Sequence, residues 1–271
     1  MHLFQFLSAT TFFACLFFGC ISPEKNEAET KSNNSSNTTE VTAEYPTVLQ
    51  QALKAHGGLD RWKSFEKLEY DVYRGEEIVD HQLIALKTRK VLLNNDQYTI
   101  GFDGQQVWVS PDTSAYPGSS ARFYHNLQFY FFALPFVLAD PGISYEQLEA
   151  REFQGKMHDG LRITYQSDVG DAANDEYRAY FDQDTHQLRV LLYTVTYFSQ
   201  SPADRYSARV YDEWQTVDGL AVPLQVTSYR WENDSLGEQR GVTKYRSVTF
   251  DNIPPDQSMF LMPSQATVSD R

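Results

Sequence analysis

Residues 205–223, RYSARVYDEWQTVDGLAVP, contain the pattern from which the fold class follows. From residue 205 to residue 210, apolar and polar side chains alternate, as they do in a β-strand with one buried face, and Glu213 and Trp214 resume the pattern. The apolar set is Tyr206, Ala208, Val210 and Trp214, and the polar set is Arg205, Ser207, Arg209 and Glu213. Asp218-Gly219 then predicts a turn into a second apolar run. We therefore expect two antiparallel strands whose polar side chains lie in water.

Runs of the same kind recur along most of the chain and indicate a long meander. Asp103-Gly104, between two of them, predicts a tight hairpin. The expected strands are 67–73, 78–88, 89–94, 97–102, 105–110, 145–155, 159–166, 175–182, 187–199, 205–216, 223–233 and 241–250. A series of about 11–12 strands exceeds what one flat sheet tolerates. The predicted fold is mainly β with a few helices: a strongly curved antiparallel sheet, or open half-barrel, with an N-terminal helix and a plug helix.

Two short helices precede these strands. Residues 46–56 place Leu49, Ala52 and Leu53 on one helical face, and a second piece covers 59–65. His56, followed by two glycines, has two interpretations: a residue at the mouth of a site, or a helix C-terminus where histidine is favourable and Gly57 supplies a positive φ. We favour the helix C-terminus.

The aromatic segment FYHNLQFYFFALPFVL (123–138) is the exception to the strand pattern. Its apolar residues fit a helix, although they occupy every face, and Pro135 should bend or end that helix. Three interpretations remain open: a core helix covering the concave face, a plug over a hydrophobic cavity, or a segment in contact with a membrane surface. For the plug we expect these residues to line the cavity: Trp108, Phe123, Leu127, Phe131 and Leu134.

The first 19 residues carry no Lys, Arg, Asp or Glu and are mostly apolar, which predicts a secretory signal peptide at 1–19. The segment ends in Gly19-Cys20, which resembles a bacterial lipobox and implies lipidation of Cys20. The alternative is an ordinary secretory peptide with an incidental cysteine. Residues 20–45 are then the lipidated N-terminus and a flexible tether rich in Ser, Asn, Thr and Glu, and 46–271 form a single β domain.

The net charge of −13 argues against nucleic acid as a partner and against attraction to anionic lipid head groups, since both require a basic surface. We therefore expect the membrane to be held through the N-terminal lipid anchor, with the protein a monomer on the cell envelope of a Gram-negative bacterium.

The order of elements resembles the lipoprotein-localisation carriers of the LolA and LolB type. Three motifs and the tail carry the resemblance, which covers most of residues 47–264: FDGQQVW (102–108), YFDQDT (180–185), WQTVDGLAVP (214–223) and VTFDN (248–252). His56-Gly57-Gly58, Trp62 and the run 129–141 are also similar to uncharacterised secreted lipoproteins of Gram-negative bacteria. The resemblance implies an open barrel that holds acyl chains under a helical lid. An arginine holds that lid in the carriers, and Arg74, Arg89 and Arg122 are candidates for it here.

No catalytic or cofactor motif is recognisable. The histidines lack zinc-site spacing, and the sequence contains no nucleophile elbow or phosphate loop. Asp182 and Asp184 could suggest calcium, but a plain Asx turn is the simpler interpretation. We expect no enzyme, no metal and no cofactor. The leading hypothesis is an envelope lipoprotein that binds a lipid or a lipoprotein acyl chain; the alternative is a structural or interaction lipoprotein with a filled core.

Overall fold

A single antiparallel sheet of thirteen strands dominates the computed structural model, which describes residues 45–166, 174–198 and 205–270. Its order is β13-β5-β4-β3-β2-β1-β12-β11-β10-β9-β8-β7-β6. The strands are β1 (Lys67–Arg74), β2 (Glu77–Ala85), β3 (Lys90–Asn94), β4 (Thr99–Phe102), β5 (Val107–Ser110), β6 (Ile143–Phe153), β7 (Lys156–Tyr165), β8 (Glu176–Asp182), β9 (Leu188–Tyr193), β10 (Ser207–Val217), β11 (Leu220–Glu232), β12 (Ser235–Asp251) and β13 (Thr267–Val268).

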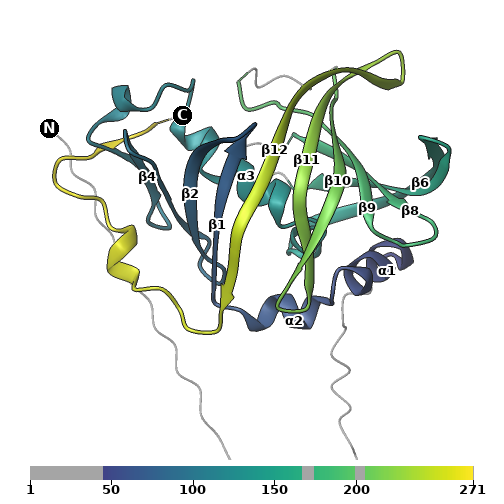
Figure 1. The fold of residues 1–271 in the computed structure, drawn as a ribbon, viewed down its shortest axis with the longest axis horizontal. Helices are drawn as coiled ribbons and strands as arrows, with labels where there is room; N and C mark the ends of the chain where they lie inside the picture. The colour runs from purple at the N-terminus through teal and green to yellow at the C-terminus, as the bar shows by residue number, and fades with distance from the viewer. Residues whose placement is uncertain (1–44, 167–173, 199–204, 271) are drawn as a thin grey trace, which may run out of the picture. The chain divides into compact units, whose positions relative to one another are not determined.

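The predicted fold class is confirmed. Neighbouring strands are consecutive in the chain except at the β1–β12 and β13–β5 pairs, and β13 and β6 form the two edges, so the sheet stays open. Figure 1 shows the strands curving around the helix α3 (Ala121–Phe132), which lies behind β1 and β12 in that view. The sequence missed only β13, a pair of residues that adds to β5 opposite Trp108 and Val109. Two residues are too few to show an alternating pattern.

The aromatic segment forms two helical pieces instead of one. The side chain of Ser120 caps α3 by accepting a hydrogen bond from the Phe123 amide at 3.1 Å. The helix ends at Phe132, and after Pro135 the chain continues as the short 3-10 helix η2 (Phe136–Ala139). This confirms the prediction that Pro135 ends the helix, since proline supplies no backbone N–H and its ring clashes with the preceding turn.

Most of the core lies between the concave face of the sheet and these two helical pieces. In β1, Leu68, Tyr70 and Val72 alternate with half-buried residues and point into this core. The Tyr70 ring stacks on Phe132, with centroids 4.5 Å apart. Every residue from Phe131 to Ala139 is buried. The C-terminal half of α3 and all of η2 are therefore anchored in the core.

The helices α1 (Thr47–Ala55) and α2 (Leu59–Ser64) pack near the turn between β10 and β11. The approach is close, because a Cβ on Gly57 would lie 2.2 Å from the carbonyl oxygen of Gly219. Gly57 also has a φ of 104°, and the Ala221 amide donates to the His56 carbonyl at 3.0 Å. The expected helix end at His56, with a positive φ at Gly57, is confirmed.

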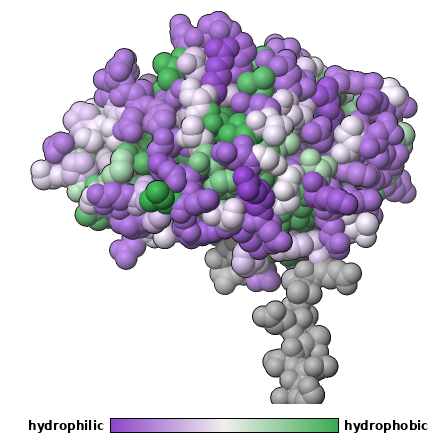
Figure 2. All heavy atoms as spheres, turned by 60° about the horizontal axis from the view of Figure 1, so that its bottom comes forward, coloured by the Kyte–Doolittle hydropathy of each residue, from purple (hydrophilic) through white to green (hydrophobic). Residues whose placement is uncertain are grey.

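Hydrophilic residues predominate on the face shown in Figure 2, and hydrophobic residues occur between them in small groups. Across the three described ranges, no helix is both long and apolar enough to cross a membrane. The predicted signal peptide and Cys20, with nearly all of the tether, lie outside the described residues. The lipid anchor therefore stays a prediction.

Candidate ligand-binding site

A cavity of about 540 Å³ lies between the N-terminal half of α3 and the sheet. Its walls come from α3, from the segment that precedes it, and from parts of β1, β2, β10, β11 and β12. Pro117, Gly118 and Ser119 line it and are exposed, so it reaches the surface. Pockets that bind small molecules have volumes of roughly 300–1,000 Å³. The cavity is therefore large enough for a ligand.

Two of the five residues predicted to line a cavity, Phe123 and Leu127, do so. They lie one helical turn apart on α3, and both are half-buried. The Phe123 ring also contacts Tyr197 and Phe198, at centroid distances of 5.2 and 5.0 Å. Phe198 is 58 % exposed, so an apolar ring lies at the surface in contact with Phe123.

Phe131 and Leu134 occupy the filled part of the core and do not line the cavity, although the Phe131 ring lies behind the wall residue Arg209. Their exposed fractions are 3 % and 2 %, and both belong to the main hydrophobic cluster. Tyr211 fixes this end of α3 by donating its hydroxyl to the Phe131 carbonyl at 2.8 Å. The core-helix interpretation thus describes the C-terminal half of the segment, whereas the N-terminal half borders a cavity.

The structure does not bring Trp108 together with the other four residues. Its indole covers Gly101, packs in a separate cluster with Leu83 and Phe260, and donates from Nε1 to the Phe260 carbonyl at 3.0 Å. The flanking Val107 and Val109 belong to the main cluster on the other side of the sheet. Trp108 therefore holds the C-terminal segment and does not line the cavity.

A chain of buried polar groups lies beside the cavity. The Tyr124 hydroxyl donates to Asp80 Oδ2 at 2.6 Å, Gln82 Nε2 donates to Asp80 Oδ1 at 2.7 Å, and Tyr70 donates to Gln82 at 2.8 Å. Burial raises the pKa of Asp80, while the bonds from Tyr124 and Gln82 oppose that rise. Burial likewise raises the pKa of Tyr116, on the cavity wall, to about 12. These tyrosines stay neutral at physiological pH, and Tyr124 and Tyr70 donate their hydroxyl hydrogens within this network.

Arg209 is the charged residue that the sequence pattern misplaced. Ala208 and Val210 pack on the outer cluster with Tyr180, whereas Arg209 and Tyr211 point to the concave side. Arg209 is only 9 % exposed, so the expectation that this polar set lies in water is wrong for it. An arginine followed by the apolar pair Val210-Tyr211 is a weak signal, and α3, which covers it, comes from far along the chain.

Of the three arginines considered for holding a lid, Arg89 contacts the helical segment. Its Nη2 lies 2.9 and 2.8 Å from the two carboxylate oxygens of Asp140, and its guanidinium stacks 5.0 Å from the Phe129 centroid. Arg74 instead lines the cavity from the end of β1, and Arg122 lies within α3. Arg89 thus fastens the anchored end of the segment through a carboxylate.

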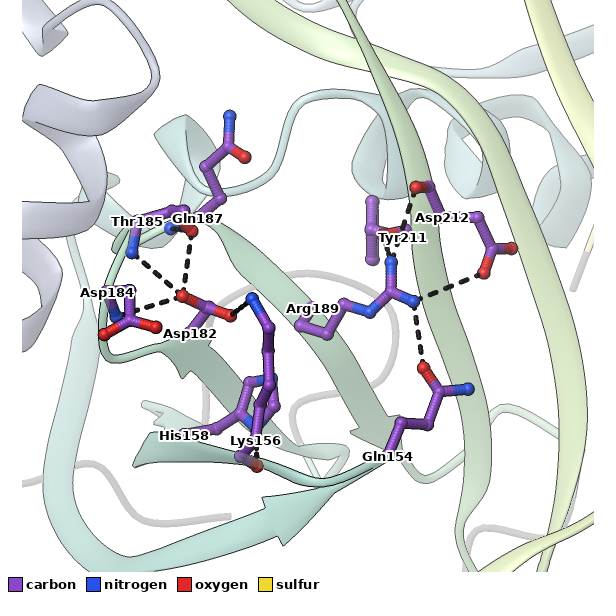
Figure 3. A network of polar contacts seen from close by, with 10 residues as sticks. All are labelled: Gln154, Lys156, His158, Asp182, Asp184, Thr185, Gln187, Arg189, Tyr211 and Asp212. Atoms are coloured by element: carbon purple, nitrogen blue, oxygen red, sulfur yellow. Dashed lines mark hydrogen bonds and ion pairs between the residues drawn. The ribbon is translucent and has the colours of Figure 1, made fainter.

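A second cavity, of about 310 Å³, lies near the turn between β8 and β9 (Figure 3). Arg189 donates to the Tyr211 carbonyl at 2.7 Å and to Gln154 at 3.0 Å, and it forms an ion pair with Asp212 at 3.8 Å. The charged groups shown in this cavity therefore have protein partners.

Asp182, in the same network, forms the predicted Asx turn. Its Oδ1 accepts from the amides of Asp184 and Thr185 at 3.0 and 2.8 Å, and Lys156 pairs with Oδ2 at 3.3 Å. Burial opposes the charged form, but these bonds outweigh it and lower the pKa of Asp182 to about 2. In the part of the chain that the structure describes, no cluster of three or more His, Cys, Asp or Glu could hold a metal ion. The network stabilises a turn.

Residues 111–208 match a family of unknown function (DUF6503), and no curated protein matches the chain. Among solved structures, the chain is similar to a DUF1329 family protein from Desulfovibrio piger, with 12 % identity, 79 % of this chain and 95 % of that chain covered, and a TM-score of 0.45. It is also similar to a LolA superfamily protein from Nitrosomonas europaea, with 9 % identity, coverage of 78 % and 97 %, and a TM-score of 0.45.

Proposed function

We propose that this protein binds a hydrophobic ligand, a lipid or a lipoprotein acyl chain, in the cavity under the N-terminal half of α3, and that it performs no catalysis. The observation that carries the proposal is the cavity of about 540 Å³, which opens to the surface and has Phe123 and Leu127 in its wall. Each methylene group buried there would contribute about 0.8 kcal/mol. A single chain could therefore bind usefully through apolar burial alone.

The anchored part of the helical segment limits how the ligand enters. Because Phe131–Ala139 is buried and Arg89 clamps Asp140, we expect this end to stay in place. The rim at Pro117–Ser119 is exposed and lines the cavity. We therefore expect a chain to enter beside the start of α3, with the helix acting as a fixed wall.

The test is a binding measurement with a cavity-filling variant. Native mass spectrometry after mild purification should reveal a bound lipid, and dansyl-labelled undecanoic acid should gain fluorescence on titration. Leu127→Trp should fill the cavity and lower the affinity at least tenfold, since the added ring occupies the space of the chain. Leu261→Trp is the matched control, because Leu261 is 60 % exposed and does not line the cavity.

The absence of both co-purified lipid and probe binding would contradict the proposal. That outcome would favour a structural or interaction lipoprotein, for which the filled core around the C-terminal half of α3 is the supporting observation.

The membrane part of the proposal is separate and rests on Cys20. We propose a lipid-anchored protein of the cell envelope, tethered through residues 20–45. Labelling with a palmitate analogue should mark the protein, and Cys20→Ser should abolish the label. Undiminished labelling of Cys20→Ser would contradict the anchor and leave the cavity proposal intact.

A further inference from the structure

The cavity carries charge of one sign. Arg74, Arg209 and Arg240 contribute to its walls, and no aspartate or glutamate among the described residues does. The chain has 36 acidic and 23 basic residues, so its average composition would favour carboxylates there. Arg240 pairs with Glu238 at 3.4 Å, and Arg74 is exposed. Arg209 differs from both because it is buried.

The guanidinium of Arg209 is held in place without a counterion. Nη1 donates to Ser228 Oγ at 2.9 Å, and the group lies 3.9 Å from the centroid of the Phe131 ring. Its Nε is buried and has no hydrogen-bond partner, and no carboxylate pairs with it among the described residues. A buried charge is costly unless it is paired, and a stacked ring compensates only part of that cost.

The buried carboxylate beside the cavity, that of Asp80, has other hydrogen-bond partners. Asp80 accepts from Tyr124 and Gln82, and neither oxygen bonds to Arg209. Arg209 therefore brings a guanidinium that has no carboxylate partner among the described residues to the wall of a cavity that also has apolar side chains. Guanidinium groups match the geometry of carboxylates and phosphates.

We propose, building on the proposed function, that the cavity takes a single-chain amphiphile with an anionic head group, either a carboxylate or a phosphate. The head group pairs with the Arg209 guanidinium, and the chain lies along Phe123 and Leu127. Arg74 and Arg240 add positive potential at the mouth. The protein thus selects ligands by the negative charge of the head group as well as by the length of the apolar chain.

The test compares three ligands that share one chain: laurate, dodecyl phosphate and dodecanol. Each competes with dansyl-labelled undecanoic acid for the full chain. Laurate or dodecyl phosphate should bind about tenfold or more tightly than dodecanol, the size expected for a hydrogen bond to a charged group. If laurate binds more tightly than dodecyl phosphate, the preferred head group is a carboxylate, and the reverse order indicates a phosphate.

The variant Arg209→Gln should remove this preference, because the affinities for laurate and dodecyl phosphate should fall about tenfold toward that for dodecanol. Arg230→Gln is the matched control on the neighbouring strand, because Arg230 is exposed and lies outside the cavity. Should Arg209→Gln fail to fold, the preference of the unmodified protein for the acids over dodecanol decides the question alone. Equal affinities for all three ligands would overturn the inference and leave the proposed function standing. Failure of all three to bind would overturn both.

Discussion

His56 should make the stability of this protein fall steeply as the pH falls from 6.5 to 4. Its side chain is fully buried, with the ring 4.5 Å from Trp214. Nδ1 lies 2.7 Å from the Ala52 carbonyl, and Nε2 has no partner among the described residues. Burial lowers the pKa of His56 from 6.5 to about 4, with the Ala52 carbonyl opposing the shift.

The sign follows from which state binds the proton. Between pH 6.5 and pH 4 the unfolded chain protonates His56 while the folded protein keeps it neutral, so acid favours unfolding. At about 1.4 kcal/mol per pKa unit, the full effect is about 3 kcal/mol, and about 2 kcal/mol is lost by pH 5. The contribution is complete above pH 6.5 and gone below pH 4.

Urea unfolding, followed by tryptophan fluorescence at pH 7.5 and pH 5, measures this loss. In His56→Phe, the difference in unfolding free energy between pH 7.5 and pH 5 should be about 2 kcal/mol smaller than in the unmodified protein. This expectation does not depend on how stable the variant is at pH 7.5. Leu49→Ala, on the same helix, is the control: it should lose about 2–5 kcal/mol at both pH values and keep the pH dependence. If His56→Phe loses as much stability between the two pH values as the unmodified protein does, the argument is refuted. An NMR titration of the His56 ring checks the same pKa without a variant.

Two further predictions concern contacts that fix the helices. Gly57→Ala should lower the free energy of unfolding by more than about 2 kcal/mol, because the new Cβ would lie 2.2 Å from a backbone oxygen. Gly58→Ala has open space around its Cβ and a φ of 96°, so it should cost about 1 kcal/mol. Equal losses for the two variants in urea unfolding would contradict the close approach at Gly57. Arg89→Ala and Asp140→Asn should show a coupling energy of about 0.5–1 kcal/mol in a double-mutant cycle, a modest value because both side chains are about one-third exposed. Additive effects would mean that the ion pair does not fasten the helix.

The strands could be predicted because alternation and turn residues are local signals. Leu161 and Ile163 alternate with Arg162, and the structure buries the first two in the core at 0 % exposure. Pro135 likewise marks the end of α3 by its own covalent geometry. Local sequence signals were therefore enough to predict the type of each element and most of their order along the chain.

Which face of each strand points to the concave core could not be predicted in the same way. Alternation tells which residues share a face, but Val107, Trp108 and Val109 are all apolar, so the pattern does not say which side of β5 meets the concave core. The answer depends on Phe260, which covers Trp108 from the far end of the chain. Arg209 was misplaced for the same reason, since its burial depends on Phe131.

The two halves of α3 explain why a cavity persists in a well-packed domain. At the C-terminal half, Phe132 stacks on Tyr70 and the space is filled. At the N-terminal half, the facing groups are tyrosine hydroxyls and arginines, which cannot pack against one another as hydrocarbon side chains do. Closing the cavity would bury Arg209 further without an anion, so the sheet and helix stay apart there. The ligand that we propose, with an anionic head group and an apolar chain, would pair with Arg209 and cover Phe123 and Leu127.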